Sequence, residues 1–253
     1  MNLTDPEYNI FKERFEYYFK NYNIDYTDEI TKNFYKYYQR LITENQKYNL
    51  TSITDTDEVI VKHFIDSVIV LKYFDIPVGA KIIDIGTGAG FPGLPLYIMR
   101  SDLNITFLES SAKKIKFTED TVISIYNGPD SKLNFICGRV EDTARDNNYR
   151  SAYDFAVSRA VAKLNILCEL AAPLICIGGY YIAYKGRNAE AEISEANSAM
   201  KILGLDIAKT QKFNISCETE SAENQRVLIK IKKIKQTHQI YPRSYAKIIK
   251  SPL

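Results

Sequence analysis

Short apolar runs alternate with longer amphipathic stretches through the middle of the chain, from about residue 76 to residue 236. Runs of this length, bounded by turn residues, are typical of buried strands, and the stretches between them are typical of helices. This alternation predicts an α/β fold with a doubly wound, parallel sheet. The expected parallel strands are residues 81–85, 105–108, 133–137, 155–157 and 180–183.

A later stretch has a different pattern. Between residues 225 and 234, the apolar side chains of Val227, Ile229 and Ile231 alternate with polar or basic ones. This period of two indicates a strand with one buried face. We expect it to run antiparallel to its neighbours.

The first 75 residues carry a helical pattern, with aromatic and aliphatic residues recurring at spacings of three and four. Residues 25–29 indicate a turn, with Thr27 as the cap of the following helix. The many tyrosines here suit packing better than stacking on bases. Residues 76–79 break the pattern, so the chain divides into an N-terminal helical region (1–75), a main domain (76–236) and a tail (237–253).

The segment from Asp84 to Gly93 joins the first strand to a helix that Pro92 and Pro95 open. It reads Asp-x-Gly-x-Gly-x-Gly, and glycines at such a turn let a flat ligand approach the backbone closely. The glycine spacing also satisfies the dinucleotide fingerprint, so an oxidoreductase is an alternative. A pyrophosphate would lie poorly beside the carboxylate of Asp84, whereas a cofactor with an amino group and a sulfonium would be favoured by it. The pattern therefore predicts S-adenosylmethionine.

The carboxyl ends of parallel strands meet at one edge of a sheet, and three further strand ends carry candidate contacts. Glu109 follows the second strand, where an acidic residue often receives ribose hydroxyls, although an exposed helix-start carboxylate is the alternative. Residues 138–141 follow the third strand, which places Val140 near the position expected for the adenine of the cofactor. Arg159 follows the fourth strand, and burying a guanidinium there indicates a ligand or a carboxylate partner.

Composition indicates a single soluble, cytoplasmic enzyme of 253 residues with one α/β domain and a smaller appendage. The four cysteines are scattered, which indicates neither a zinc site nor a disulfide framework. The N-terminus has no apolar signal core. Residues 166–184 are the most hydrophobic long stretch, but Glu169, Pro173 and two glycines interrupt it, so we expect a helix end followed by a strand and no membrane span.

The net charge of +2 hides an asymmetry. From Asn224 onward the chain has eight basic residues and no acidic one. Such a basic tail is typical of a polyanion-binding surface, which makes nucleic acid a candidate partner. The alternative is that the lysines decorate an edge strand and discourage aggregation. The candidate phosphate contacts are Arg226, Lys230, Lys232, Lys233, Arg243 and Lys247.

These motifs together resemble the bacterial small-subunit ribosomal RNA methyltransferase G family, also called the glucose-inhibited division protein B family. The most specific elements are His-Phe-x-Asp-Ser at residues 63–67 and Phe-Pro-Gly-Leu-Pro-Leu at residues 91–96. The resemblance also covers residues 48–53, 84–90, 109–117, 138–141, 158–162, 178–179, 185–186 and 241–243.

The resemblance implies a Rossmann-like class I methyltransferase fold: a doubly wound, mostly parallel seven-stranded sheet with an N-terminal helical extension. It implies methyl transfer from S-adenosylmethionine to N7 of a guanine in 16S ribosomal RNA, either free or within a subunit particle, by a monomer. It assigns cofactor contacts to Gly86, Phe91, Glu109, Val140, Glu141 and Arg159.

Two departures from the family pattern stand out. The acidic residue after the second strand is commonly Asp in the family and is Glu109 here. The tail after residues 241–243 lacks the usual Gly-Thr-Pro-like segment, which weakens the case for RNA contacts there.

The implied chemistry needs no general base, because guanine N7 has an exposed lone pair. We therefore assign no catalytic residue, and we interpret His63 as a structural histidine. Two motifs of other nucleic-acid methyltransferases are missing from the sequence: a Pro-Cys nucleophile and an Asn/Asp-Pro-Pro-aromatic element. A small-molecule methyltransferase and an RNA-binding protein without catalysis remain alternatives.

Overall fold

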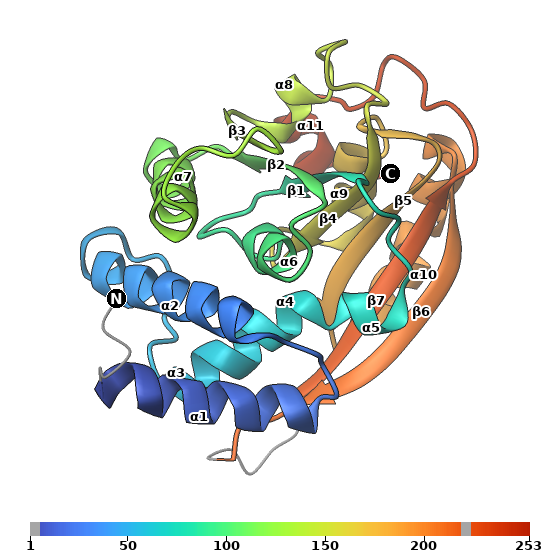
Figure 1. Ribbon diagram of the computed structural model, residues 1–253. Coiled ribbons are helices and arrows are strands. Elements are labelled where there is room, and N and C mark those ends of the chain that lie inside the picture. Colours follow the sequence, from blue (N-terminus) through green and yellow to red (C-terminus); the bar gives the residue numbers. More distant parts are fainter. Residues whose placement is uncertain (1–5, 219–223) are drawn as a thin grey trace.

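The computed structural model describes residues 6–218 and 224–253. In this part of the chain a seven-stranded sheet has the order β3-β2-β1-β4-β5-β7-β6, with helices on both faces (Figure 1). The strands are β1 (Lys81–Ile85), β2 (Asn104–Glu109), β3 (Leu133–Cys137), β4 (Tyr153–Arg159), β5 (Ile175–Gly186), β6 (Leu205–Ile215) and β7 (Asn224–Lys233).

The sheet is mostly parallel, as the sequence predicts. Strands β1 to β5 pair in parallel, and β7 pairs antiparallel with both β5 and β6. Glu109 and Arg159 are the last residues of their strands, whereas the sequence pattern placed them just beyond the strand ends. The pattern did not reveal β6, because this edge strand is mostly exposed on both faces and lacks regular apolar alternation.

The helices follow the predicted alternation with the strands. They are α1 (Pro6–Asn21), α2 (Asp28–Tyr48), α3 (Thr56–Glu58), the π-helical segment η1 (Val59–Ile65), α4 (Asp66–Val68), α5 (Val70–Tyr73), α6 (Gly93–Met99), α7 (Ala112–Tyr126), α8 (Val140–Thr143), α9 (Leu164–Ala171), α10 (Ala189–Leu203) and α11 (Tyr245–Lys250). None of the described helices is both long and apolar enough to cross a membrane.

Two hydrophobic cores flank the sheet. The first packs the N-terminal helices, α6 and α7 against one face, and the second packs α9 and α10 against the other. The stretch 166–184 is divided between α9 and β5, as expected. Burial on both faces explains why the central strands appear as continuous apolar runs in the sequence.

An aromatic core holds the N-terminal helices on the sheet. The Phe15 and Phe19 rings stack with their centroids 3.8 Å apart, and Phe34 bridges Phe15 and Phe64. The Oγ1 atom of Thr27 accepts a hydrogen bond from the amide of Ile30 at 3.2 Å, which confirms Thr27 as the cap of α2. The buried tyrosines of these helices pack inside this core, as the sequence indicated.

Asp84 lies beneath the glycine turn, not in contact with solvent. Its Oδ2 atom accepts hydrogen bonds from Thr87 Oγ1 at 2.6 Å and from the amide of Gly93 at 2.8 Å. Burial raises the pKa of Asp84 to about 7, although both hydrogen bonds and the charge of Arg159 act to lower it. The carboxyl group therefore ties β1 to the start of α6. The expectation that it faces a cofactor amino group is wrong.

The tail folds back onto the domain. In α11, Ile248 is buried against Ile166 and Leu170 of α9. Before it, the guanidinium of Arg243 donates to both carboxylate oxygens of Glu169, at 2.9 and 2.7 Å, and the Arg243 amide donates to the same carboxylate at 2.8 Å. Glu169 is almost completely buried, so this ion pair fastens the tail to the sheet domain.

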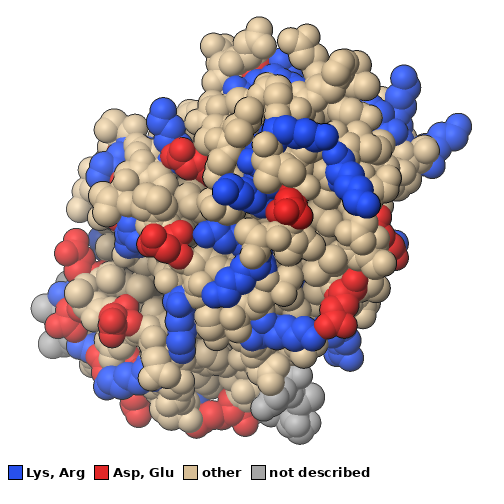
Figure 2. Space-filling model, turned by 90° about the vertical axis from the view of Figure 1, so that its right-hand side faces the viewer, with Lys and Arg blue, Asp and Glu red and all other residues tan. Residues whose placement is uncertain are grey.

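Some of the basic residues from Asn224 onward are engaged within the fold. Lys233 is fully buried and donates to the carbonyl of Ala172. Lys230 lies over the Tyr180 ring, 4.2 Å from its centroid. Since β7 lies between β5 and β6, the interpretation of its lysines as guards of an edge strand is wrong. Figure 2 shows Lys and Arg side chains over much of one face, with Asp and Glu side chains among them.

We expect Arg243→Ala to lower the free energy of unfolding by about 3–5 kcal/mol, because it leaves the Glu169 carboxylate buried without a partner. Denaturant unfolding measures the change. Adding Glu169→Gln to Arg243→Ala should recover much of the lost stability, since the unpaired charge disappears. Equal stabilities of the single and double variants would contradict this role for the ion pair.

The raised pKa of Asp84 also makes a prediction about stability. A carboxyl group with a higher pKa in the folded state binds protons more readily there, so its contribution to stability falls as pH rises between its unfolded and folded pKa values. We therefore compare the unfolding free energies of wild type and Asp84→Asn. As pH rises from about 4 to about 7, the unfolding free energy of the wild type should fall relative to that of Asp84→Asn.

Asp102→Asn provides the control for this pH dependence. Arg100 lowers the pKa of Asp102 to about 2, so the difference between wild type and this variant should stay constant above pH 5. Denaturant unfolding at several pH values measures both differences. A constant difference for Asp84→Asn over the same range would show that Asp84 keeps an ordinary pKa.

Candidate functional site

The glycine turn after β1 bends the backbone through conformations that other residues adopt rarely. Gly86 has a φ of +67°, and a Cβ atom built on it would lie 2.9 Å from Cγ2 of Val161. A Cβ on Gly93 would lie 2.7 Å from the Phe107 ring, so α6 packs directly against β2. The missing Cβ atoms thus make room for the Val161 side chain at Gly86 and for close helix–strand packing at Gly93.

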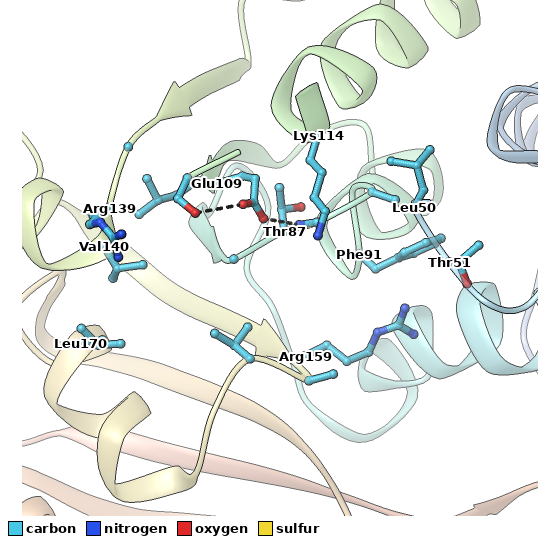
Figure 3. Close-up of a pocket in the computed structure, with 18 of the residues that line it drawn as sticks. Leu50, Thr51, Thr87, Phe91, Glu109, Lys114, Arg139, Val140, Arg159 and Leu170 are labelled. Carbon is cyan, nitrogen blue, oxygen red and sulfur yellow. Dashed lines mark hydrogen bonds between the residues drawn. The ribbon is translucent and has the colours of Figure 1, made fainter. Parts of the chain in front are cut away.

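A cavity of about 450 Å³ opens at this edge, above the ends of β1, β2 and β4 and the start of α8 (Figure 3). This position beside the switch point between β1 and β4 is where open α/β sheets bind ligands. All six residues singled out from the sequence line the cavity: Gly86, Phe91, Glu109, Val140, Glu141 and Arg159. Asp84 does not line it.

The Glu109 carboxylate is held in the cavity wall by backbone groups. It accepts hydrogen bonds from the amide of Gly88 at 3.1 Å and from the amide of Ser111 at 2.9 Å. The extra methylene of Glu relative to Asp thus brings the carboxylate within reach of the glycine turn. Lys114, on the first turns of α7, lines the same part of the cavity (Figure 3). Lys114 lies within the resemblance at residues 109–117, but no pattern in the sequence indicated a role for it.

Phe91 is the aromatic centre of the opposite wall. Its ring stacks with that of His63, with centroids 4.6 Å apart, and with that of Tyr37 at 5.3 Å. The Arg159 guanidinium lies 4.7 Å from the Phe91 centroid, within the range of a cation–π contact. The Tyr37 hydroxyl also donates to the carbonyl of Ala89 at 2.5 Å. The N-terminal helices therefore form part of the site, through contacts that no sequence spacing indicated.

Arg159 joins the sheet to the N-terminal region. Its Nη1 atom donates to the carbonyls of Lys62 and His63, at 3.0 and 3.3 Å, and to Asp66 Oδ2 at 3.2 Å. These contacts confirm a carboxylate partner for the guanidinium and leave its side chain only 12% exposed. The arginine therefore has a structural role at the cavity edge, whatever else it contacts.

His63 is in the wall of the cavity but is poorly suited to act as a base. Arg159 Nη2 can only donate, so His63 Nδ1, 3.2 Å away, accepts, and Nε2–H donates to Thr51 Oγ1 at 2.8 Å. Burial and the charge of Arg159 lower the pKa of His63 to about 3, so the ring is neutral. The interpretation of His63 as a structural histidine agrees with these contacts.

Other lining residues come from segments far apart in the sequence. Leu50 and Thr51 follow α2, Leu170 lies in α9, and Tyr245 opens α11. Thr51 lies within the motif at residues 48–53, which was the available signal for it. Leu170 and Tyr245 had no such signal, because only the packing of α11 on α9 brings them to the cavity.

Comparison with known proteins identifies the family of this chain. The model of the rRNA small subunit methyltransferase G family matches residues 30–223. The chain is 39% identical over 231 residues to the ribosomal RNA small subunit methyltransferase G of Alkaliphilus oremlandii, covering 91% of this chain and 94% of that protein. It is 42% identical over 217 residues to the protein of the same name from Clostridium beijerinckii, covering 85% and 88%.

Solved structures with low sequence identity share the fold. The 16S rRNA (adenine(1408)-N(1))-methyltransferase from Catenulisporales acidiphilia superposes with a TM-score of 0.50 at 12% identity, covering 63% of this chain and 90% of that one. The geranyl diphosphate C-methyltransferase from Streptomyces coelicolor also gives a TM-score of 0.50 at 12% identity, covering 66% and 78%. The fold is that of Rossmann-like methyltransferases, and the sequence resemblance is confirmed: the chain belongs to the rRNA small subunit methyltransferase G family.

Proposed function

We propose that this protein transfers a methyl group from S-adenosylmethionine to N7 of a guanine in 16S ribosomal RNA of the small subunit. The observation that carries the proposal is the cavity at the glycine turn, which gathers all six residues that the family resemblance assigned to the cofactor. Membership of the family supports the ribosomal RNA substrate.

The residues around the cavity suit S-adenosylmethionine. Gly86 and Gly88 are partly exposed in the cavity wall, where a ligand could approach their backbone, and the Glu109 carboxylate is an acceptor for ribose hydroxyls. Val140 and Glu141, at the start of α8, would flank the adenine. Phe91 and Arg159 would complete the wall at the methionine end. When bound, the cofactor supplies an electrophilic methyl group on its sulfonium.

The reaction asks the protein mainly for orientation. Guanine N7 has a free lone pair, so the chain need not remove a proton from the base. His63 agrees with this, because its Nδ1 lone pair already accepts from Arg159. Holding two reactants in line can lower a barrier by about 7–11 kcal/mol. Arg159 and Phe91 would serve this role by fixing the edge of the cavity.

We also propose how the chain is organised for this activity. Residues 1–75 form an N-terminal helical region that completes the site, residues 76–236 form the S-adenosylmethionine-dependent methyltransferase domain, and residues 237–253 form the basic tail. The protein acts as a monomer in the cytoplasm, on ribosomal RNA that is free or within a subunit particle.

A transfer assay with labelled S-adenosylmethionine tests the function. Unmodified 16S ribosomal RNA, free and in small-subunit particles, is incubated with the protein, and the labelled nucleoside is identified by mass spectrometry. We expect one labelled guanine carrying the methyl at N7. Cofactor binding without label in either RNA would favour the small-molecule methyltransferase, and label on another atom would overturn the N7 assignment.

For the wild type we expect a dissociation constant for the cofactor in the micromolar range, which is a binding free energy of about −8 kcal/mol. Gly86→Val should abolish this binding. The branched side chain would strain the turn and displace Val161 into the cavity. Gly79→Val is the matched control, because Gly79 has a similar φ of +74° and no atom within 4 Å of an added Cβ. Calorimetric titration with S-adenosylhomocysteine that gives wild-type affinity for a folded Gly86→Val variant would refute the assignment.

Arg159→Ala should reduce the turnover number for methyl transfer by roughly a hundredfold, because small displacements in a reactive geometry have effects of this size. Arg150→Ala is the control, since Arg150 also donates to several backbone carbonyls but lies away from the cavity. Both variants should lose stability, and only Arg159→Ala should lose turnover at a temperature where both are folded. Equal turnover in the two variants would leave Arg159 with a purely structural role.

A further inference from the structure

A second cavity, of about 610 Å³, adjoins the first one across Arg159. The two cavities share His63, Arg159, Ala160 and Val161 as a common wall. Ala160 has a φ of +58°, a conformation that is uncommon for a residue with a Cβ atom and that tends to occur at functional sites. The wall between the cavities is thus narrow and locally strained.

Methyl transfer constrains what the second cavity can hold. The reacting atoms must approach to about 3–3.5 Å, so the target base has to enter space next to the cofactor. Enzymes that act on a base take it out of its stack and enclose it in a pocket. The second cavity offers apolar side chains, Ile53 and Val161, beside charged ones, as a flat base with a phosphate would require.

We propose that the second cavity receives the target guanosine of the RNA and that Arg226 binds the phosphate of this nucleotide. The proposal rests on the proposed function and adds to it a substrate subsite and a residue that recognises the substrate.

Arg226 has the free hydrogen-bonding capacity that a phosphate needs. Within the described residues, its guanidinium makes two long contacts: Nε lies 3.5 Å from Asp66 Oδ1, and Nη1 lies 3.4 Å from the carbonyl of Gln225. Its side chain is 29% exposed, against 12% for Arg159. A guanidinium presents five N–H donors in a planar fork that matches phosphate oxygens. Arg226 lines the second cavity, and its fork has no other hydrogen-bond partner among the described residues.

Asp66 holds Arg226 in place without neutralising the wall. It lies between the two guanidiniums, with Oδ2 accepting from Arg159 at 3.2 Å. Its Oδ1 is buried and accepts no hydrogen bond from the residues that the structure describes, so it faces Arg226 as an ionic partner only. One carboxylate against two guanidiniums leaves one positive charge at this wall, which attracts an anion.

The other cations that line the second cavity have closer carboxylate partners. Lys62 pairs with Glu58 at 2.8 Å, Lys185 with Glu192 at 2.7 Å, and the more exposed Lys163 with Glu195 at 3.2 Å. Among the cations that line the second cavity, Arg226 has the longest carboxylate contact, and it shares that carboxylate with Arg159. A third cavity, of about 280 Å³, shares Gly186, Glu192 and Arg226 with the second. Arg226 thus lies between two adjoining cavities, and the third could receive the nucleotide next to the target guanosine.

Kinetics on unmodified 16S ribosomal RNA test the role of Arg226. Losing a charged hydrogen bond to a phosphate should raise the KM for RNA by roughly tenfold to a hundredfold in Arg226→Ala. Arg226→Lys should fall between this variant and the wild type, because it keeps the charge and loses the fork. The affinity for S-adenosylhomocysteine should change less than twofold in both variants.

Arg100→Ala is the matched control. Arg100 has a side chain that is 30% exposed, pairs with Asp102 and lines neither cavity. The Arg100→Ala variant should have the wild-type KM for RNA. Its unfolding free energy measures how much stability is lost when a paired arginine is removed. A wild-type KM in folded Arg226→Ala, with active wild-type enzyme, would overturn the subsite and leave the proposed function standing. Wild-type enzyme that binds S-adenosylhomocysteine but methylates no RNA would instead overturn the proposed function.

Small ligands test the subsite without turnover. Guanosine 5′-monophosphate and guanosine are titrated into the wild type saturated with S-adenosylhomocysteine, and binding is followed by NMR. We expect the monophosphate to bind roughly tenfold more tightly than the nucleoside in the wild type, and equally in Arg226→Ala. Equal affinities in the wild type, or a preference that survives Arg226→Ala, would show that the phosphate is not held by Arg226.

Discussion

The arrangement of the site depends on one guanidinium, that of Arg159. It lies at the end of β4, beside the point where the strand order of the sheet reverses, and it donates to the carbonyls of Lys62 and His63 and to the carboxylate of Asp66. Its face lies against Phe91 in the glycine turn. A planar group with five donors can satisfy all of these partners at once, whereas a lysine could not. The N-terminal region and the sheet are thereby held at a fixed distance on either side of the cavity.

The basic side chains of this protein divide into those that stabilise the fold and those that remain available to a ligand. Two cations from the basic end of the chain stabilise the fold: Arg243 pairs with the buried Glu169, and Lys233 is buried and donates to a backbone carbonyl. A buried charge with a good partner costs little, while the same charge exposed as a tail would attract polyanions without specificity. Arg226, at the start of β7, has only a long contact with Asp66, and it is the arginine that we propose for the substrate phosphate.

Burial shifts the pKa values of two groups near the cavity, His63 and Asp84, in opposite directions. Burial and the charge of Arg159 lower the pKa of His63, which keeps its ring neutral. Asp84, whose pKa burial raises, lies under the turn and outside the cavity. An in-line attack by a lone pair on a methyl group needs position and a stable electrostatic setting more than proton transfer. The site provides both.

Local pattern determined much of what was predictable here. The alternating apolar runs specified five parallel strands and a late antiparallel one, since burial on both faces leaves a direct mark in the sequence. The glycines and the strand-end residues Glu109, Val140 and Arg159 could be assigned to one edge, because parallel strands all end there. Thr27 was identifiable as a cap because capping depends on neighbouring residues alone.

Tertiary structure decided the rest, because it depends on which distant segments pack together. The edge strand β6 left no apolar pattern, and Asp84 was turned toward the start of α6 by hydrogen bonds that its position in the sequence did not indicate. The entry of His63 and Tyr37 into the wall around Phe91 followed from packing of the N-terminal helices on the sheet. The destination of each basic side chain, whether core, ion pair or cavity, was set by the carboxylates and carbonyls that the fold placed within its reach.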